Sequence, residues 1–562
     1  MYTPDLAPIG GSLLWSSLIA VTPLLTVFVT LGVLKWKAHW AGLSALAVAL
    51  VVAVAAYGMP LHLAALSATQ GFAFGLFPIM WIVLNAIWLY EVTVKSGRFE
   101  DLRQVIDTIS HDPRIQAIII AFCFGGLLEA LAGFGAPVAI TGVMLMSIGF
   151  GAMRAAVVVL IANTAPVAFG AIATPIITAG TLTGIPYTEI AAVVGRQTPL
   201  LALLVPLLLV LIADGRRGLR DVWPFALAVG AAFAVAQFVS ANWISPELTD
   251  VIAALVGLAV AVLMLRVWSP RNTGEARERM LAARDTESPD GLDGSAPSGP
   301  SGGVAVRDRV DHALRPRTVM MALFPYLLII VVFSLAKLWT PAKSWLASTD
   351  VKFGWPGLDG NILTAAGKAA TSTVYALGWL SSPGSLLLLC GVVVAIVYRL
   401  SAADTVKVYG ATVAKLKFAI LTVASVLALA YVMNQSGQTI TIGAWIAGTG
   451  AAFAFLSPIL GWLGTAVTGS DTSANALFAT LQQTAAQHAG LDPTLLVAAN
   501  TSGGVVGKMI SPQNLTIAAT AVGLLGREAD IFRKVIWWSL GMLIVLCLLV
   551  GLQSSVLSWM LP

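Results

Sequence analysis

Apolar residues run through this chain in long blocks, and short polar connections separate one block from the next. The hydrocarbon core of a bilayer needs about 20 consecutive apolar residues of α-helix, and blocks of this length recur from one end of the chain to the other. The pattern predicts an all-α polytopic membrane protein with about 12 transmembrane helices. The expected spans are residues 13–34, 39–57, 71–94, 155–180, 186–213, 222–240, 247–268, 319–338, 382–399, 415–436, 493–521 and 534–557.

Two further apolar stretches are interrupted by small and polar residues that break helices. Residues 115–150 contain GFGAP, and residues 441–489 contain TGSDTS. Irregular backbone at membrane depth is tolerated only where protein buries it or water reaches it. We therefore expect two re-entrant hairpins, one in each of these stretches.

Composition and charge agree with this topology. The chain is 58% hydrophobic and 10% charged with a mean hydropathy of +0.88, which excludes an ordinary soluble protein. Lys and Arg cluster in the short connections, where they favour the cytoplasmic side. This distribution predicts that both termini lie outside, and it does not indicate a nucleic-acid surface. Membrane lipid is the expected surrounding of the helices. The three cysteines fall in apolar runs without metal-like spacing.

Two similar segments indicate an internal repeat. NTAPVAFGAIATP (163–175) and NTSGGVVGKMISP (500–512) share N-T, a glycine and a proline at matching positions, and GFGAP precedes the first much as GSDTS precedes the second. Segment 71–94 crosses inward whereas its counterpart 415–436 crosses outward, so the repeats are inverted. Inverted repeats with interrupted helices are characteristic of secondary transporters.

The chain then divides into four predicted parts. Residues 1–213 form the first repeat and 319–562 the second, with two connecting transmembrane helices in 214–268. Residues 269–318 are rich in Pro, Gly and Ser and lack apolar periodicity, which predicts a disordered cytoplasmic linker.

Three ionisable residues lie deep within the apolar runs: Glu129, Asp471 and Lys508. A charge in such a position costs about 3 kcal/mol or more on insertion scales, and the repeat duplicates none of the three. Lys508 can pair directly with a substrate carboxylate, or it can tune a carboxyl group, Glu129 or Asp471, that carries a coupling proton. A buried Lys–acid pair that only fixes helix contacts is the structural alternative.

The interrupted segments supply further candidate binding residues. The N-terminal ends of half-helices present free N–H groups and a positive dipole end, which suit a carboxylate. Glycines there can instead serve only close helix packing. The candidates for substrate binding, besides Lys508, are Asn163, Thr164, Asn500, Thr501, Ser511, Asn514, Gly133, Gly135, Gly469, Ser470, Thr472 and Ser473.

An enzyme is the competing class, but the apolar runs contain no HExxH, no GxSxG and no pair of histidines. We expect no catalytic residue, no metal and no cofactor. The residues by themselves therefore indicate an inverted-repeat secondary transporter for an anion, and they leave the oligomeric state open.

Four segments resemble the bacterial L-lactate permease family: GLLEALAGFGAPVAITG, IANTAPVAFGAIATP, TGSDTSANALFATLQ and AANTSGGVVGKMISPQNLTIA. The resemblance implies import of L-lactate, and also of D-lactate and glycolate, by proton symport across the bacterial inner membrane. It also implies membership of the ion-transporter superfamily, with an elevator-like movement of a transport domain that contains both hairpins. The expected partners are a small monocarboxylate and protons. A sodium-coupled carboxylate transporter is the alternative, because oxygens at paired hairpin tips can also cage sodium.

Overall fold

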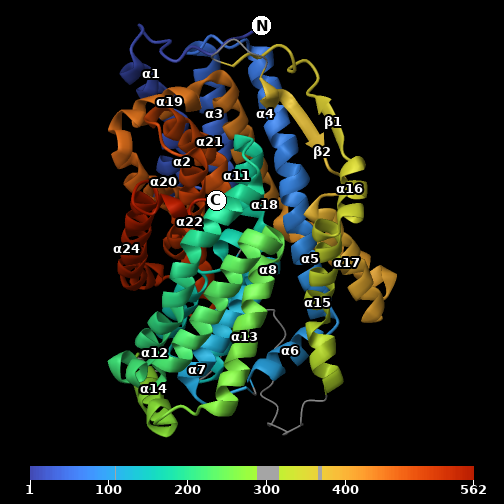
Figure 1. The fold of residues 1–562 in the computed structure, drawn as a ribbon, viewed down its shortest axis with the longest axis vertical. Coiled ribbons are helices and arrows are strands. Elements are labelled where there is room, and N and C mark those ends of the chain that lie inside the picture. The colour runs from blue at the N-terminus through green and yellow to red at the C-terminus, as the bar shows by residue number, and fades with distance from the viewer. Residues whose placement is uncertain (108, 134, 288–315, 365–369) are drawn as a thin grey trace.

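The computed structural model describes residues 1–107, 109–133, 135–287, 316–364 and 370–562. Helices make up most of this part of the chain, and its two strands, β1 (Val351–Gly354) and β2 (Val374–Leu377), pair as an antiparallel hairpin. The hairpin lies near the N-terminus at one end of the molecule, and α14 lies at the opposite end (Figure 1). The prediction of an all-α polytopic membrane protein is confirmed.

The helices follow one another along the whole chain, and 3-10 or π-helical turns join several of them. The α-helices before residue 270 are α1 (Leu13–Ala20), α2 (Thr22–Phe28), α3 (Ala38–Ala55), α4 (Leu61–Phe74), α5 (Trp81–Lys95), α6 (Arg98–Asp107), α7 (Pro113–Ala117), α8 (Gly125–Ala132), α9 (Ala136–Ser147), α10 (Ala152–Ala162), α11 (Gly170–Thr183), α12 (Tyr187–Val239) and α13 (Thr249–Val267). The later ones are α14 (Thr273–Glu287), α15 (Pro316–Leu338), α16 (Thr340–Ser348), α17 (Pro383–Val397), α18 (Ala402–Ser436), α19 (Gln438–Ile446), α20 (Phe453–Thr468), α21 (Asp471–Ala489), α22 (Pro493–Gly507), α23 (Pro512–Ala521) and α24 (Glu528–Gln553). The short turns are Val29–Val33, Gly75–Met80, Ile118–Phe124, Val167–Phe169, Ser240–Ile244, Pro246–Leu248, Thr371–Thr373, Ala447–Ala452, Lys508–Ile510 and Ser558–Met560.

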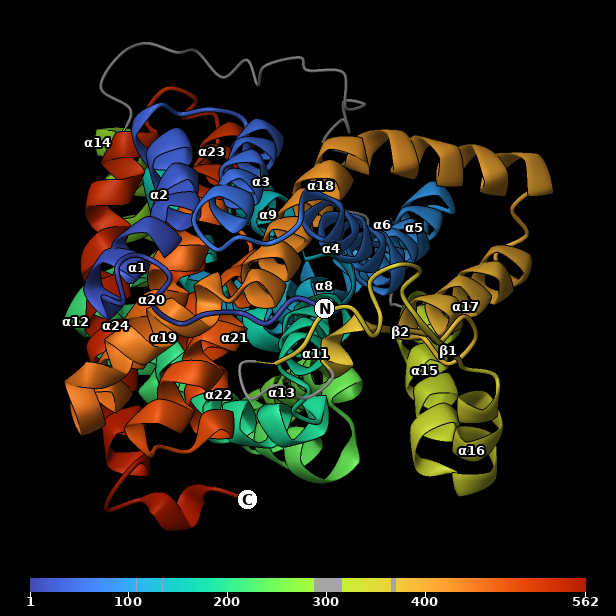
Figure 2. The ribbon, with the colours of Figure 1, turned by 90° about the horizontal axis from the view of Figure 1, so that it is seen from above.

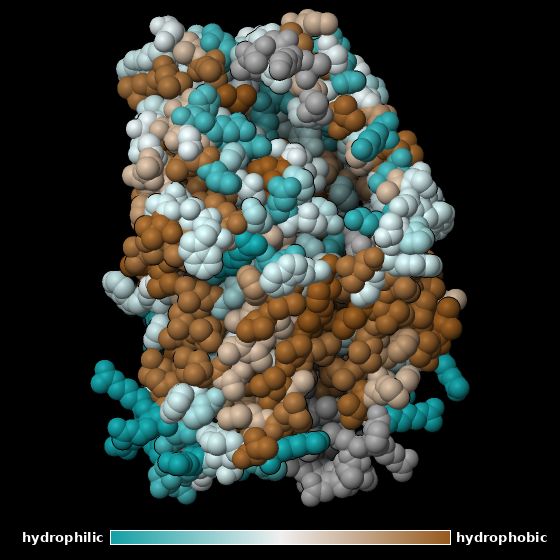
Figure 3. Space-filling view, in the orientation of Figure 1, coloured by the Kyte–Doolittle hydropathy of each residue, from teal (hydrophilic) through white to brown (hydrophobic). Residues whose placement is uncertain are grey.

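Ten helical stretches of the described chain are long and apolar enough to cross a membrane, or eleven if the bent pair α10 and α11 is one span. The expected spans 186–213 and 222–240 run together as α12, with a kink at Gly215, whose φ is 69°. The expected span 382–399 is the 15-residue helix α17. On the face seen in Figure 3, hydrophobic residues gather below a more polar upper region.

The first part of the predicted linker differs from the expectation of disorder, because Thr273–Glu287 form α14. Two of its residues, Ala276 and Met280, are buried, and Arg279 pairs with Asp214 on α12 at 2.8 Å. These tertiary contacts stabilise a helix whose sequence has no strong apolar period. Residues 288–315 of the linker lie outside the described chain.

Helices from the two halves of the chain intermix. α18 packs against α3 and α4, and α17 packs against α5. On the other side of the molecule α20 packs against α22 and α24, while α21 packs against α11 and α22 (Figure 2). The interrupted segments of both halves therefore come together in the interior.

Candidate functional site

The second interrupted segment breaks next to Lys508. α22 ends at Gly507, a 3-10 turn covers Lys508–Ile510, and Pro512 begins α23. Ser511 is extended, with φ −67° and ψ 140°, and its hydroxyl accepts a hydrogen bond from the N–H of Asn514 at 3.3 Å. The side-chain amide of Asn514 donates to the Lys508 carbonyl at 3.2 Å, so side chains satisfy backbone groups that the break frees.

The first interrupted segment breaks earlier in the repeat than the second, because Asn163 matches Asn500, which lies within α22. α10 ends at Ala162, irregular turns begin at Asn163, and α10 and α11 meet at an angle of 62°. The first turn of α11 is left-handed, because Ala171, Ile172 and Ala173 have φ values of 43°, 56° and 55°. Residues other than glycine seldom adopt this conformation, so packing from outside must hold this turn in place.

A buried ion pair joins the two breaks. Lys508 Nζ lies 2.6 Å from Glu129 Oε1, and the side-chain amide of Asn163 donates to Glu129 Oε2 at 2.9 Å. Lys508 is 6% exposed and Glu129 is 2% exposed. Glu129 comes from α8 in the first predicted hairpin. The ion pair and the Asn163 amide that bonds to it therefore come from three separate interrupted segments. A Cβ on Gly170 would lie 2.9 Å from Glu129 Oε1, which explains a glycine at that position.

A narrow gap lies beside this pair, and it is too small to hold a water molecule with the side chains as they stand. Asn163, Thr164, Lys508 and Asn514 are its polar lining residues, and the others are apolar. The lining residues are Leu160, Asn163, Thr164, Val167, Val505, Lys508, Met509 and Asn514. A cation, amides and a hydroxyl among apolar walls suit a small organic anion.

The connection from α20 to α21 supplies another buried carboxylate. Gly469 has φ 76° and ends α20, and Ser470 caps α21 by accepting a hydrogen bond from the N–H of Ser473 at 3.3 Å. Asp471 Oδ1 accepts a hydrogen bond from the Thr465 hydroxyl at 3.4 Å, while Oδ2 has no hydrogen-bond partner among the described residues. Lys508 attracts this carboxylate electrostatically. Thr472, like Ser473, is buried in the same first turn.

The connections from α8 to α9 and from α20 to α21 both meet α23. Gly135, with φ 87°, lies so close to Ile517 that an added Cβ would be 2.3 Å from Ile517 Cδ1. Gly469 lies equally close to Gln513, because a Cβ added to Gly469 would be 2.5 Å from Gln513 Oε1. Gly133 borders the ion pair instead, with its Cβ position 3.2 Å from Glu129 Oε1.

Two of the expected binding residues lie in a different polar cluster. Asn500 donates to Asn475 Oδ1 at 2.9 Å, and Thr501 donates to the same oxygen at 3.1 Å. Gln482 donates to Asn500 Oδ1 at 3.3 Å. These hydrogen bonds tie α21 to α22 about two helical turns from Lys508. The Thr164 hydroxyl, although it borders the gap, donates to the Ile161 carbonyl at 2.7 Å.

Asp250 is a buried carboxyl group that the sequence argument missed. It lies in the first turn of α13, is 0% exposed, and has no hydrogen-bond partner for either oxygen within the described chain. Its field acts on the pair formed by Glu129 and Lys508. The available signal was that Asp250 directly precedes the uncharged run 251–265. Its place at the edge of that run made it resemble an ordinary loop charge.

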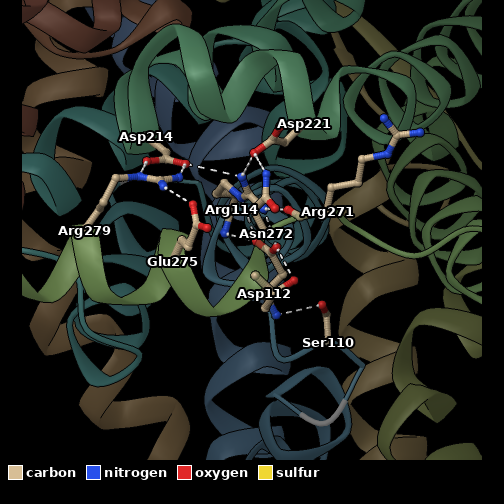
Figure 4. A network of polar contacts seen from close by, with 10 residues as sticks. Ser110, Asp112, Arg114, Asp214, Asp221, Arg271, Asn272, Glu275 and Arg279 are labelled. Carbon is tan, nitrogen blue, oxygen red and sulfur yellow. Dashed lines mark hydrogen bonds and ion pairs between the residues drawn. The ribbon is translucent and has the colours of Figure 1, made fainter.

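Arg114 lies in one of the short connections where basic residues are expected to favour the cytoplasmic side, but it also has a structural role. It is completely buried and pairs with Asp112 at 2.8 Å, Asp221 at 3.1 Å and Asp214 at 3.3 Å. Arg279 of α14 joins the same network through Asp214, and this hydrogen bonding raises the pKa of Arg279 (Figure 4). The network connects the start of the first hairpin to the kink of α12.

This chain is similar to known L-lactate permeases and to a glycolate permease. The family model described as L-lactate permease matches residues 16–557. The L-lactate permease of Bacillus subtilis (strain 168) is 42% identical over 578 residues, covering 100% of both chains. Glycolate permease GlcA of Escherichia coli (strain K12) is 41% identical and covers 100% of this chain and 99% of its own.

Among solved structures, the YdaH transporter of Alcanivorax borkumensis matches 88% of this chain and 89% of its own. The identity is 15% and the TM-score is 0.45, so this likeness supports no inference about the site or its mechanism.

Proposed function

The chain belongs to the L-lactate permease family, and on this premise we propose that it imports L-lactate by proton symport across the bacterial inner membrane. Membership of the family makes it a multi-pass membrane transporter. D-lactate and glycolate are proposed as further substrates, because a relative named glycolate permease is 41% identical. Both share the 2-hydroxy carboxylate group, and glycolate lacks only the methyl group.

The buried pair of Lys508 and Glu129 beside the narrow gap carries this proposal. The carboxylate of lactate takes the place of Glu129 on Lys508, and the pair must separate for it to enter because the gap is narrow. Asn163 and Asn514 are then positioned to bond the 2-hydroxyl group. Val167 contributes to the apolar wall for the methyl group.

Proton coupling follows from the charges that remain after this exchange. Once lactate occupies Lys508, Glu129 is left in a buried place without its cation, and an uncompensated buried charge is strongly unfavourable. A proton on Glu129 removes that charge, so one proton accompanies one lactate. Asp471, with one oxygen unpartnered among the described residues and Lys508 acting on it, is the second proposed proton carrier.

Movement of one group of helices against another is the proposed route. We call α3, α4, α5, α17 and α18 the scaffold group, because they pack on one another. We call α8–α11 and α19–α23 the transport group, because it holds both hairpin tips and both breaks. The proposal is an elevator-type movement of the transport group, with both termini outside and the end that carries α14 in the cytoplasm.

Uptake of labelled L-lactate into proteoliposomes tests this function. An inward proton gradient is expected to drive accumulation, whereas an inward sodium gradient at fixed pH is expected to have no effect. Uptake that follows sodium and ignores pH would indicate a sodium-coupled carrier instead. Unlabelled D-lactate and glycolate are expected to compete.

The same assay tests the proposed proton carrier. Glu129→Gln is expected to abolish uptake driven by the pH gradient while retaining part of the lactate–lactate exchange, because Gln cannot release a proton. Asp471→Asn is the matched variant. Gradient-driven uptake that survives in Glu129→Gln but is lost in Asp471→Asn would assign the proton to Asp471.

A further inference from the structure

Asp250 is a third buried carboxyl group near the proposed lactate site, and the proposed exchange of lactate for Glu129 does not involve it. It is 0% exposed, and neither oxygen has a hydrogen bond within the described chain. Gln237 of α12 lies next to it. The Gln237 amide nitrogen donates to the Ala165 carbonyl at 3.0 Å, while Gln237 Oε1 accepts from Thr198 at 3.3 Å. One N–H of the Gln237 amide and its oxygen are therefore engaged elsewhere, while the second N–H is free to interact with Asp250.

The charged neighbours of Asp250 come from two sides. α13 packs against α8, which carries Glu129, and Lys508 acts on Asp250 across the same interior. Glu247, in the 3-10 turn before α13, accepts hydrogen bonds from Ser245 at 2.6 Å and Tyr187 at 3.0 Å. Cys123, in the turn Ile118–Phe124, faces Gly257 further along α13. α11 and the turn Ser240–Ile244 bring no ionisable side chain to this helix.

Charge balance decides which form of Asp250 this place accommodates. Lys508 supplies one positive charge, and it lies 2.6 Å from Glu129. An ionised Asp250 would be a second carboxylate without a cation of its own, with only the uncharged Gln237 amide beside it, which is a costly state for a buried group. A protonated Asp250 carries no charge and leaves the pair of Glu129 and Lys508 balanced.

We propose that Asp250 is a further proton-binding site of this transporter, and that it must hold its proton for a carboxylate substrate to bind at Lys508. The inference rests on the proposed function. The step is a simple proton exchange with water, in which the Asp250 O–H bond breaks to give a carboxylate and a proton. Ionised Asp250 opposes an incoming anion, so substrate binding depends on the protonation of Asp250 as well as that of Glu129.

Infrared spectroscopy of the purified full-length protein tests the protonation directly and without lactate. At neutral pH the difference spectrum between the wild type and Asp250→Asn is expected to contain the C=O stretching band of a buried protonated carboxyl group. Asp404→Asn, which changes a carboxylate in the first turn of α18, is the control and is expected to leave the band in place. An unchanged band in Asp250→Asn overturns the proposal.

Calorimetric titration with L-lactate across a pH series tests the consequence. Above the pH at which Asp250 ionises, wild-type affinity is expected to fall about tenfold more per pH unit than that of Asp250→Asn, which cannot ionise. Asp250→Glu is expected to restore the steeper dependence. The same pH dependence in the wild type and Asp250→Asn, or loss of binding at every pH in a folded Asp250→Asn, overturns the proposal. If the wild type itself binds no lactate, the proposed function fails, and the infrared result still decides the protonation of Asp250.

Discussion

Lys508 is the side chain on which the site depends most. Its ammonium group lies 2.6 Å from Glu129, and it also acts on Asp471 and Asp250. The Lys508 ammonium group therefore interacts with three buried carboxyl groups. If an anion binds to Lys508, the electrostatic surroundings of all three change. This arrangement offers a direct way for an anion to influence proton binding.

Replacing Lys508 tests its role in binding. Lys508→Met is expected to weaken L-lactate binding by ~30-fold or more, because losing one partner of a buried charge pair costs about 2–5 kcal/mol. Isothermal titration calorimetry of the purified protein measures the loss. Unchanged affinity would remove Lys508 from the site.

The same substitution is also expected to destabilise the fold by roughly 3–5 kcal/mol, because it leaves Glu129 buried without its cation. The double variant Lys508→Met/Glu129→Gln is the control. It is expected to recover most of the lost stability, measured by thermal unfolding, without recovering lactate binding. A double variant as unstable as the single one would show that the charge of Glu129 is not the cause.

At the scale of elements, α20 and α22 meet backbone to backbone. A Cβ on Gly503 would lie 2.0 Å from the Pro458 carbonyl oxygen, and one on Gly507 would lie 2.2 Å from that of Trp462. From the opposite helix, a Cβ on Gly461 would lie 1.8 Å from the Asn500 carbonyl oxygen. The spacing of Gly503 and Gly507 is that of a GxxxG motif, which allows such close approach in membranes. Because Lys508 directly follows Gly507, this packing also fixes the position of Lys508 relative to α20.

Gly503→Ala tests this contact. The added methyl group meets backbone atoms that cannot turn away, so overpacking of about 1–3 kcal/mol is expected, with a lower melting temperature of the purified protein. Gly541→Ala on α24 is the matched control, because nothing lies within 4 Å of its Cβ position. Equal melting temperatures for the two variants would contradict close packing of α20 on α22.

At the scale of the whole molecule, contacts between α18 and α21 join the scaffold group to the transport group. Asn434 of α18 donates a side-chain hydrogen bond to Thr480 of α21 at 3.1 Å. An elevator-type movement must break this contact in each cycle. Glu91 of α5 and Lys415 of α18, which lie 2.7 Å apart, both belong to the scaffold group and keep their distance in such a movement.

Cross-linking distinguishes the two contacts. Cys547, which is partly exposed whereas Cys123 and Cys390 are buried, is first replaced by Ala. The pair Asn434→Cys/Thr480→Cys, treated with a short thiol-specific cross-linker that reduction cleaves, is then expected to lose L-lactate uptake in proteoliposomes and to regain it on reduction. The pair Glu91→Cys/Lys415→Cys is expected to retain uptake when cross-linked. Full uptake by the cross-linked Asn434/Thr480 pair would exclude relative movement of the two groups at this contact.

The sequence by itself determined that the chain is a helical membrane protein, where its interrupted segments fall, and which family it resembles. Apolar length, helix-breaking residues and the cost of a buried charge are local properties, so they are readable without a structure. The breaks next to Asn163 and Lys508 lie within the segments expected from their paired N-T, Gly and Pro residues. The inverted repeats and the roles of the site residues stay predictions.

Only the tertiary structure decided which buried groups meet. Glu129 and Lys508 are 379 residues apart, and nothing in either segment specifies the other as its partner. Asp250 and Arg114 stand at the edges of apolar runs, where sequence cannot distinguish a solvated charge from one that neighbouring helices bury. Burial and pairing depend on how distant helices pack, and in this protein those contacts bring Lys508 and the carboxyl groups into one interior.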